Sequence, residues 1–225
     1  MSMTVSQAVE SRRSIRAFTS QPVDRAVLER VLAKAQHAPS GGNLQPWHAQ
    51  ILTGEPLAQL IDAVSAELPR GAMGGDTEYA VYPEGLAEPY RSRRYKVGED
   101  MYAALGVTRE DKTGRMIQFA RNFRAFDAPV LMLVHFPRFM GSPQWSDVGM
   151  WLQTLMLLLR EEGLDSCAQE AWSLYHSVIR NTISIPDDHI LFCGLSIGYA
   201  DPSAAINGFA VDRAPLDEVV EFKGF

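Results

Sequence analysis

The order of helical and strand-like segments constrains the fold of this chain most strongly. Strand-like apolar runs are few and short, and they fall at residues 47–51, 130–136, 166–169 and 190–199. Helical patterns outnumber them, and several strands are separated by more than one helix. This order lacks the regular alternation that builds a doubly wound parallel sheet. We therefore expect an α+β fold in which helices surround a small sheet.

The helical patterns have recognisable starts and stops. Asp24 is a good N-cap for a helix that ends before Pro39, and Trp47, Ala49 and Ile51 mark the inward face of the strand that follows. Further helices are expected at residues 4–11, 56–68, 99–105, 108–122 and 146–162. The last of these is apolar on nearly every side, so it either lies wholly in the core or also faces a second subunit.

Composition narrows the class of protein. The 225 residues are 46% hydrophobic, which suffices for one domain over residues 1–225, and the net charge of −6 argues against a nucleic-acid partner. The two cysteines, Cys167 and Cys193, have neither CxxC spacing nor the density of a disulfide-rich secreted domain. We find no signal-peptide pattern, and the most apolar segment is too short to span a membrane. These features favour a cytoplasmic protein.

Two polar motifs point to a bound phosphorylated cofactor. The first contains Arg12, Arg13, Ser14 and Arg16, and the second is the turn of small residues at 38–47. Guanidiniums bind phosphate oxygens with paired charge-assisted hydrogen bonds, and a glycine-rich turn lets the backbone approach a flat ring. A solvated helix face is the alternative interpretation of the arginines.

These two motifs together resemble the FMN-binding signature of the nitroreductase family, in the subgroup of nitrobenzoate reductases. Residues 122–130, 163–170, 194–198 and 213–220 extend the resemblance over nearly the whole chain. The resemblance implies a nitroreductase-like fold with a small mixed central sheet. It also implies a homodimer that exchanges its C-terminal extensions and holds FMN at the subunit interface.

The resemblance assigns roles to individual residues. Arg12, Ser14 and Arg213 share the phosphate and ribityl end of FMN, although Arg213 is distant in sequence. Arg13 or Arg16 lies near the pyrimidine edge, and Arg16 is our choice for the cation that stabilises the reduced flavin. No side chain is expected to act as a nucleophile or general acid.

Three other segments complete the expected cofactor site: Pro39, Ser40, Gly41 and Asn43 from the partner subunit, Asn122 at the pyrimidine edge, and Gln169 with Glu170 near N5 and O4 of the ring. Backbone groups of the last pair are expected to make the contact. An ordinary helix cap is the alternative role for the asparagine.

Other catalytic motifs are not supported. Residues 194–198 fit the G-x-S-x-G pattern of serine hydrolases, but no histidine follows Ser196 to complete a triad. The five histidines and two cysteines have no metal-site spacing, so we expect no metal. Neither a dinucleotide-binding fingerprint nor a P-loop is present. A nicotinamide cofactor would therefore visit the protein transiently.

Residues 69–98 form an irregular stretch rich in glycine, tyrosine and arginine. Such a stretch is either a lid-like insertion over an aromatic substrate or a mobile surface excursion. Arg91, Arg93 and Arg94 suggest that the substrate carries a carboxylate.

The resemblance implies an FMN-dependent NAD(P)H oxidoreductase that reduces nitroaromatic compounds to hydroxylamines by ping-pong hydride transfer. Quinone or enoate reduction and dehalogenation remain alternatives on the same scaffold. A flavin-binding protein without enzymatic activity is a further alternative. The sequence does not distinguish NADH from NADPH.

Overall fold

The computed structural model describes residues 3–70 and 77–225, and four strands in these residues form one sheet. They are β1 (His48–Thr53), β2 (Val130–Pro137), β3 (Asp165–Gln169) and β4 (His189–Gly198), in the order β1-β2-β4-β3. Each neighbouring pair is antiparallel, so the expected mixed sheet is corrected to an antiparallel one. A parallel pairing occurs at an isolated bridge between Ser14 and Ser166. Apolar patterns carry no strand direction, which the connections decide in three dimensions.

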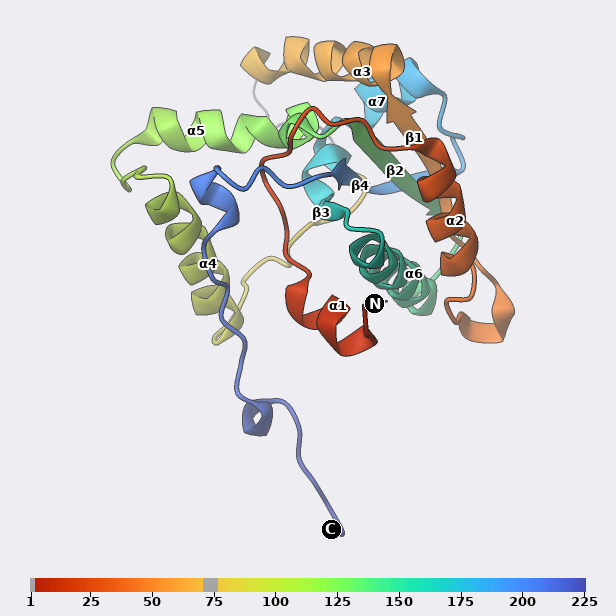
Figure 1. Cartoon of the computed structure of the whole chain (residues 1–225), viewed down its shortest axis with the longest axis vertical. Helices are drawn as coiled ribbons and strands as arrows, with labels where there is room; N and C mark the ends of the chain where they lie inside the picture. The colour runs from red at the N-terminus through yellow and green to blue at the C-terminus, as the bar shows by residue number, and fades with distance from the viewer. Residues whose placement is uncertain (1–2, 71–76) are drawn as a thin grey trace.

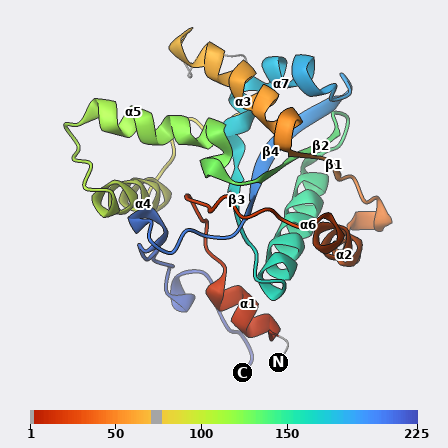
Figure 2. The ribbon, with the colours of Figure 1, turned by 45° about the horizontal axis from the view of Figure 1, so that its top comes forward.

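Helices cover both faces of this sheet (Figures 1 and 2). The α-helices are α1 (Val5–Ser11), α2 (Arg25–Ala35), α3 (Gly54–Glu67), α4 (Tyr90–Ala104), α5 (Lys112–Ala120), α6 (Ser142–Glu161) and α7 (His176–Ile183). The short 3₁₀ turns are η1 (Gly41–Asn43), η2 (Leu68–Arg70), η3 (Arg121–Asp127), η4 (Glu170–Tyr175), η5 (Ala205–Asn207) and η6 (Leu216–Glu218). The predicted N-cap of α2 is confirmed, because the Asp24 carboxylate accepts a hydrogen bond from Ala26 N at 2.9 Å.

Two hydrophobic clusters lie on opposite faces of the sheet. Alternate residues of β2 point to opposite sides, so that Leu131 and Leu133 join one cluster while Met132 and Val134 join the other. The first cluster packs under α3, α7 and the turns η3 and η4, and the second packs under α2 and α6. All but the last residue of β2 are buried, which explains its continuous apolar run.

The long helix α6 presents one face to the core. Trp151 and Leu155 are buried within it, whereas Met150 is 39% exposed. The helix therefore leaves part of its apolar surface uncovered in the monomer. In the described part of the chain, no helix combines the length and apolar content needed to cross a bilayer.

Two local expectations were wrong. Residues 90–98 are not irregular, because they form the first part of α4. Gly71, Gly74 and Gly75 of the expected lid lie outside the described residues. In β1 the buried residue is Leu52, whereas Ile51 is 38% exposed. β1 is an edge strand, and the helix α3 that follows it covers the face that carries Leu52.

Candidate functional site

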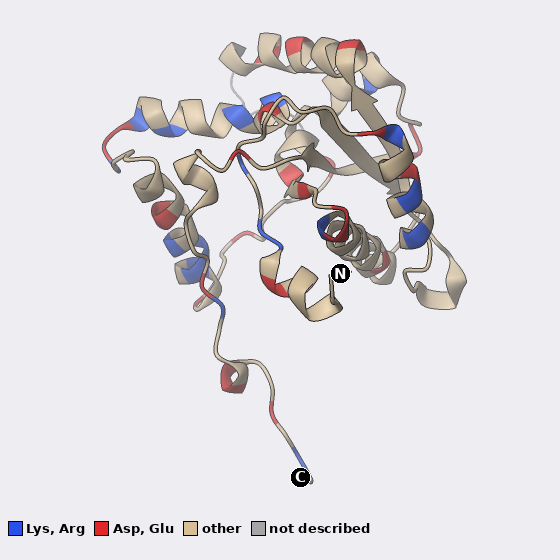
Figure 3. Cartoon of the chain, viewed as in Figure 1, with Lys and Arg blue, Asp and Glu red and all other residues tan. Residues whose placement is uncertain are grey.

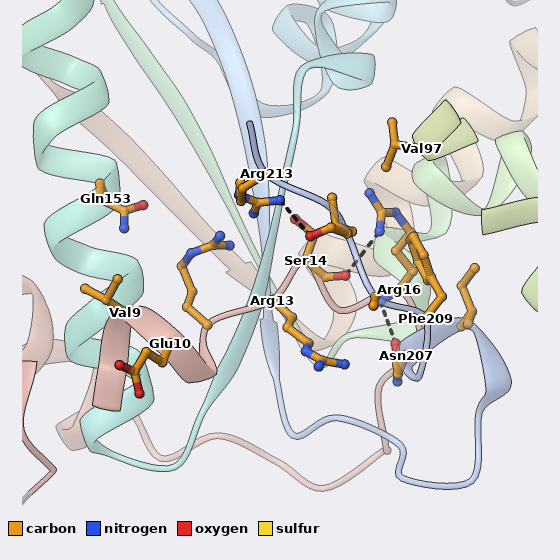
Figure 4. Close-up of a pocket in the computed structure, with 14 residues that line it drawn as sticks. Val9, Glu10, Arg13, Ser14, Arg16, Val97, Gln153, Asn207, Phe209 and Arg213 are labelled. Atoms are coloured by element: carbon orange, nitrogen blue, oxygen red, sulfur yellow. Dashed lines mark hydrogen bonds between the residues drawn. The ribbon is translucent and has the colours of Figure 1, made fainter. Parts of the chain in front are cut away.

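A cavity of about 620 Å³ opens beside the extended segment that follows α1. Its charged and polar lining includes Arg12, Arg13, Ser14, Arg16, Gln153, Asn207 and Arg213, and Glu10 is the acidic residue among the described residues that line it. Figure 4 shows the side chains of Arg13, Arg16 and Arg213 around Ser14. The arginine motif and the distant Arg213 therefore meet in one cavity within a single chain.

The edge of β3 holds the arginine motif in an extended conformation. Ile15 N donates a hydrogen bond to Ser166 O at 3.1 Å, and Ile15 and Ala17 are buried. Side chains alternate along an extended segment, so Ser14 and Arg16 face the cavity. The interpretation of the arginines as a solvated helix face is wrong, because the segment leaves α1 after Ser11.

Asn207 is a site residue that the sequence analysis missed. Its Oδ1 accepts a hydrogen bond from Arg16 N at 2.9 Å, and its Nδ2 donates to Ala17 O at 2.8 Å. These two bonds hold the C-terminal segment against the arginine motif and so direct Phe209 and Arg213 to the cavity. A single asparagine in a loop carries no sequence signal for this role.

The guanidiniums in the cavity are largely free of protein anions. Among the described residues, the guanidiniums of Arg12 and Arg13 have no ion-pair or hydrogen-bond partner, and that of Arg213 donates only to the backbone oxygens of Val211 and Asp212. Figure 3 shows this basic segment directly after α1. Burial raises the pKa of the Cys167 thiol, which senses the charges of Arg16 and Arg12, to about 11, so this group stays neutral and does not offset the positive charge. The cavity therefore suits a polyanion.

The fit to a phosphorylated ring cofactor is good. The cavity volume lies within the range of about 300–1,000 Å³ that is typical of small-molecule sites. Apolar side chains from Val9, Val97, Ile206 and Phe209 line it beside the arginines. The arrangement can hold a phosphate by charge and a flat ring by packing.

Asn122 and Gln169 do not line this cavity, and their side chains bond to each other. Gln169 Nε2 donates to Asn122 O at 2.9 Å and to Asn122 Oδ1 at 3.2 Å, while Gln169 Oε1 accepts from Ser196 Oγ at 2.5 Å. Ser196 is fully buried in β4, which leaves it no role as a hydrolase nucleophile. Glu170 is exposed at the start of η4.

The turn that carries Pro39, Ser40, Gly41 and Asn43 lies away from the cavity in the same chain. It is held by a buried acid that the sequence analysis missed, because Asp147 Oδ1 on α6 accepts a hydrogen bond from Gly41 N at 3.2 Å. This turn therefore needs a second chain if it is to reach a ligand in the cavity.

An antiparallel sheet between helical layers, with an arginine-rich cavity beside its edge, defines an α+β protein built to bind a phosphorylated ligand. Comparison with known proteins identifies the family. The chain belongs to the nitroreductase family, whose model matches residues 9–199.

Relatives of known activity cover almost the whole chain. A chloronitrobenzene nitroreductase of Comamonas testosteroni is 37% identical over 97% of this chain and 96% of its own length. A 4-nitrobenzoate reductase of Pseudomonas putida is 36% identical over 96% of this chain and 94% of its own.

Solved structures agree with this assignment. The FMN- and NADPH-dependent nitroreductase NfnB of Sphigopyxis sp. strain HMH is 52% identical, with a TM-score of 0.96 over 99% of this chain and 100% of that one. The FMN-dependent NfnB of Mycobacterium smegmatis in complex with NADPH is 32% identical, with a TM-score of 0.90 over 98% of this chain and 100% of that one.

Proposed function

We propose that this chain is an FMN-dependent NAD(P)H oxidoreductase that reduces nitroaromatic compounds to hydroxylamines. The observation that carries the proposal is the convergence of Arg12, Ser14, Arg16 and Arg213 on one cavity. The relatives named as chloronitrobenzene and 4-nitrobenzoate reductases support the same substrate class. The structure named as FMN- and NADPH-dependent supports the cofactors.

Bound FMN would supply two-electron transfer between NAD(P)H and the nitro compound. Each transfer is balanced by two protons, so a nitro group becomes a nitroso group and water, and the nitroso group then becomes a hydroxylamine. The protein supplies position and charge. Arg12, Ser14 and Arg213 hold the phosphate end of the cofactor, and Arg16 or Arg13 places a cation at the pyrimidine edge, where it favours negative charge on the ring.

The proposed active form is a homodimer of one-domain chains, each spanning residues 1–225. The partner subunit supplies Pro39, Ser40, Gly41 and Asn43 to the flavin. Asn122, Gln169 and Glu170 do not line the cavity of the single chain, so they would border a part of the ring that extends out of it, the last two through their backbone. Val5 of α1 is 77% exposed and Phe222 of the C-terminal segment is 66% exposed. That segment extends away from the body (Figure 1). Exposed apolar side chains of this kind favour burial against a second copy.

The compartment proposed is the cytoplasm, with neither nucleic acid nor membrane as a partner. Cys167 and Cys193 are both buried and free, which fits a reducing environment.

The test is flavin binding by the double variant Arg12→Ala, Arg213→Ala, measured by quenching of FMN fluorescence. Loss of two charge-assisted phosphate contacts should raise the Kd of FMN by at least about 100-fold. The control is Arg25→Ala, because this residue is exposed on α2 and, among the described residues, its guanidinium pairs only with Glu29. Wild-type FMN affinity in the double variant would refute the proposed site.

Absorbance spectra test the reaction itself. The flavin bands should bleach anaerobically with NADPH or NADH and return with 4-nitrobenzoate. Bands that never bleach would identify a flavin-binding protein instead of a reductase. Bands that return with a quinone but not with a nitro compound would favour the quinone reductase.

A further inference from the structure

A second cavity of about 660 Å³ adjoins the first, between α4 and the C-terminal segment. Val97, Val211 and Arg213 line both cavities, so the two are continuous at Arg213. Under the proposed function Arg213 lies at the phosphate end of FMN. The second cavity therefore adjoins the phosphate end of the proposed FMN site.

Most charged residues of the second cavity are already paired. Arg93 binds Glu218 at 2.6 Å, and Lys96 binds Asp100 at 2.6 Å and Asp212 at 2.8 Å. These pairs join α4 to the C-terminal segment. Two positive charges meet three negative ones in these pairs, so they offer no attraction to a further anion.

Arg94 differs from its neighbours on α4. Among the described residues it has no acidic partner, and its guanidinium carbon lies 3.8 Å from the centre of the Tyr82 ring. A guanidinium that stacks on an aromatic face keeps its N–H groups free in its own plane. Arg91 is 2.7 Å from Glu88 and does not line the cavity. Of the three arginines that suggested an anionic substrate, the structure leaves Arg94 available.

We propose that Arg94, stacked on Tyr82, binds the 2′-phosphate of NADPH and so makes the enzyme prefer NADPH to NADH. This inference rests on the proposed function. A 2′-phosphate carries nearly two negative charges and three acceptor oxygens, which match the free edge of a guanidinium. A small aromatic acceptor must touch the flavin ring, so its carboxylate is too close to the ring to fill a cavity that adjoins the phosphate end of FMN. A nicotinamide dinucleotide is long enough to place a phosphate there.

Binding of adenosine phosphates to the FMN-loaded protein tests this directly, because no reaction occurs. Isothermal titration should show that wild-type protein binds 2′,5′-ADP more tightly than 5′-AMP. Arg94→Gln should weaken 2′,5′-ADP binding by about 10- to 100-fold, the range for one charged hydrogen-bonding group, and leave 5′-AMP unchanged. Tyr82→Phe keeps the ring and should behave as wild type. The control Arg91→Gln removes a guanidinium on the same helix that is already paired.

Steady-state rates give the second readout. Arg94→Gln should lower kcat/KM for NADPH by a similar factor, chiefly through KM, and leave kcat/KM for NADH unchanged. An equal loss with both donors, or wild-type affinity of Arg94→Gln for 2′,5′-ADP, would overturn the proposal. A rise in KM for 4-nitrobenzoate but not for nitrobenzene would assign the anion to the acceptor and would also overturn it.

Failure of the proposed function has a separate signature. In that case neither NADPH nor NADH bleaches the flavin of the wild-type protein, independently of the result of the 2′,5′-ADP titration.

Discussion

Replacement of Gln169 tests how much the buried hydrogen bonds of its side chain contribute to the stability of the fold. Gln169 is 3% exposed, and its side chain joins four elements: η3 through Asn122, β4 through Ser196, η4 through Trp172, and its own strand β3. We expect Gln169→Leu to lose stability. Leucine has similar size but neither donates nor accepts hydrogen bonds, so the buried Ser196 hydroxyl and Trp172 indole N–H lose their acceptor, and the half-buried Asn122 carbonyl loses its donor.

The magnitude follows from the number of buried polar groups that are left alone. Each unsatisfied buried group costs about 1–3 kcal/mol, so the two of them lower the free energy of unfolding by about 2–6 kcal/mol. The unfolding entropy of a folded protein is about 2.1 cal/mol/K per residue. For 225 residues this converts to a fall of about 4–13 °C in Tm.

The assay is thermal unfolding followed by circular dichroism, at one protein concentration and saturating FMN, because ligand and association both shift Tm. Gln169→Glu keeps the acceptor for Ser196 but turns an oxygen toward the oxygens of Asn122. Its Tm should therefore fall at least as far as that of Gln169→Leu. Gln59→Leu is the control, since Gln59 is exposed on α3 and its side chain bonds, in the described part of the chain, only to Glu55. A Tm of Gln169→Leu within the range of the control would refute the reasoning.

Burial lowers the pKa of His135 to about 4. The unfolded chain then binds more protons between about pH 6.5 and 4, so stability should fall as the pH falls through this range, and urea unfolding of His135→Gln should show less of this dependence. Gly194→Ala places a Cβ 2.3 Å from Cδ1 of the fully buried Trp172 and should lower Tm. The control Gly149→Ala on α6 adds a Cβ in open space and should not lower Tm. Equal Tm values for the two variants would contradict the packing argument. Asp147→Ala removes the acceptor that holds η1 and should raise the Kd of FMN about 10-fold in a fluorescence titration. An unchanged Kd would show that the turn makes no contact with the flavin.

The elements of the fold could largely be predicted from the sequence. Asp24 caps α2, the apolar run at residues 130–136 is the buried strand β2, and residues 146–162 fall mostly in α6. Propensity, capping and periodicity act over a few residues, so a local pattern reports them. The direction of the strands and the exposed face of β1 could not be predicted, because the connections and the covering helix decide them.

The candidate site was predictable only in part. Arg12, Arg13, Ser14 and Arg16 form a local motif, and their resemblance to a known signature reaches the distant Arg213. Nothing local marks Asn207, whose role comes from two hydrogen bonds to a segment about 190 residues away. The sequence also did not show that Arg91 and Arg93 of α4 pair with acidic residues whereas Arg94 stacks on Tyr82.

The sequence by itself determined where most helices and all four strands form and which residues carry the charge for a phosphorylated cofactor. Only the tertiary structure decided that Arg213 lies beside Ser14, that the Gln169 side chain bonds within the core, and that Arg94 keeps its guanidinium free. The physical reason is the distance along the chain over which each interaction acts. Capping and side-chain alternation act between neighbours in the chain, whereas a binding cavity depends on contacts between segments that meet only after the chain has folded.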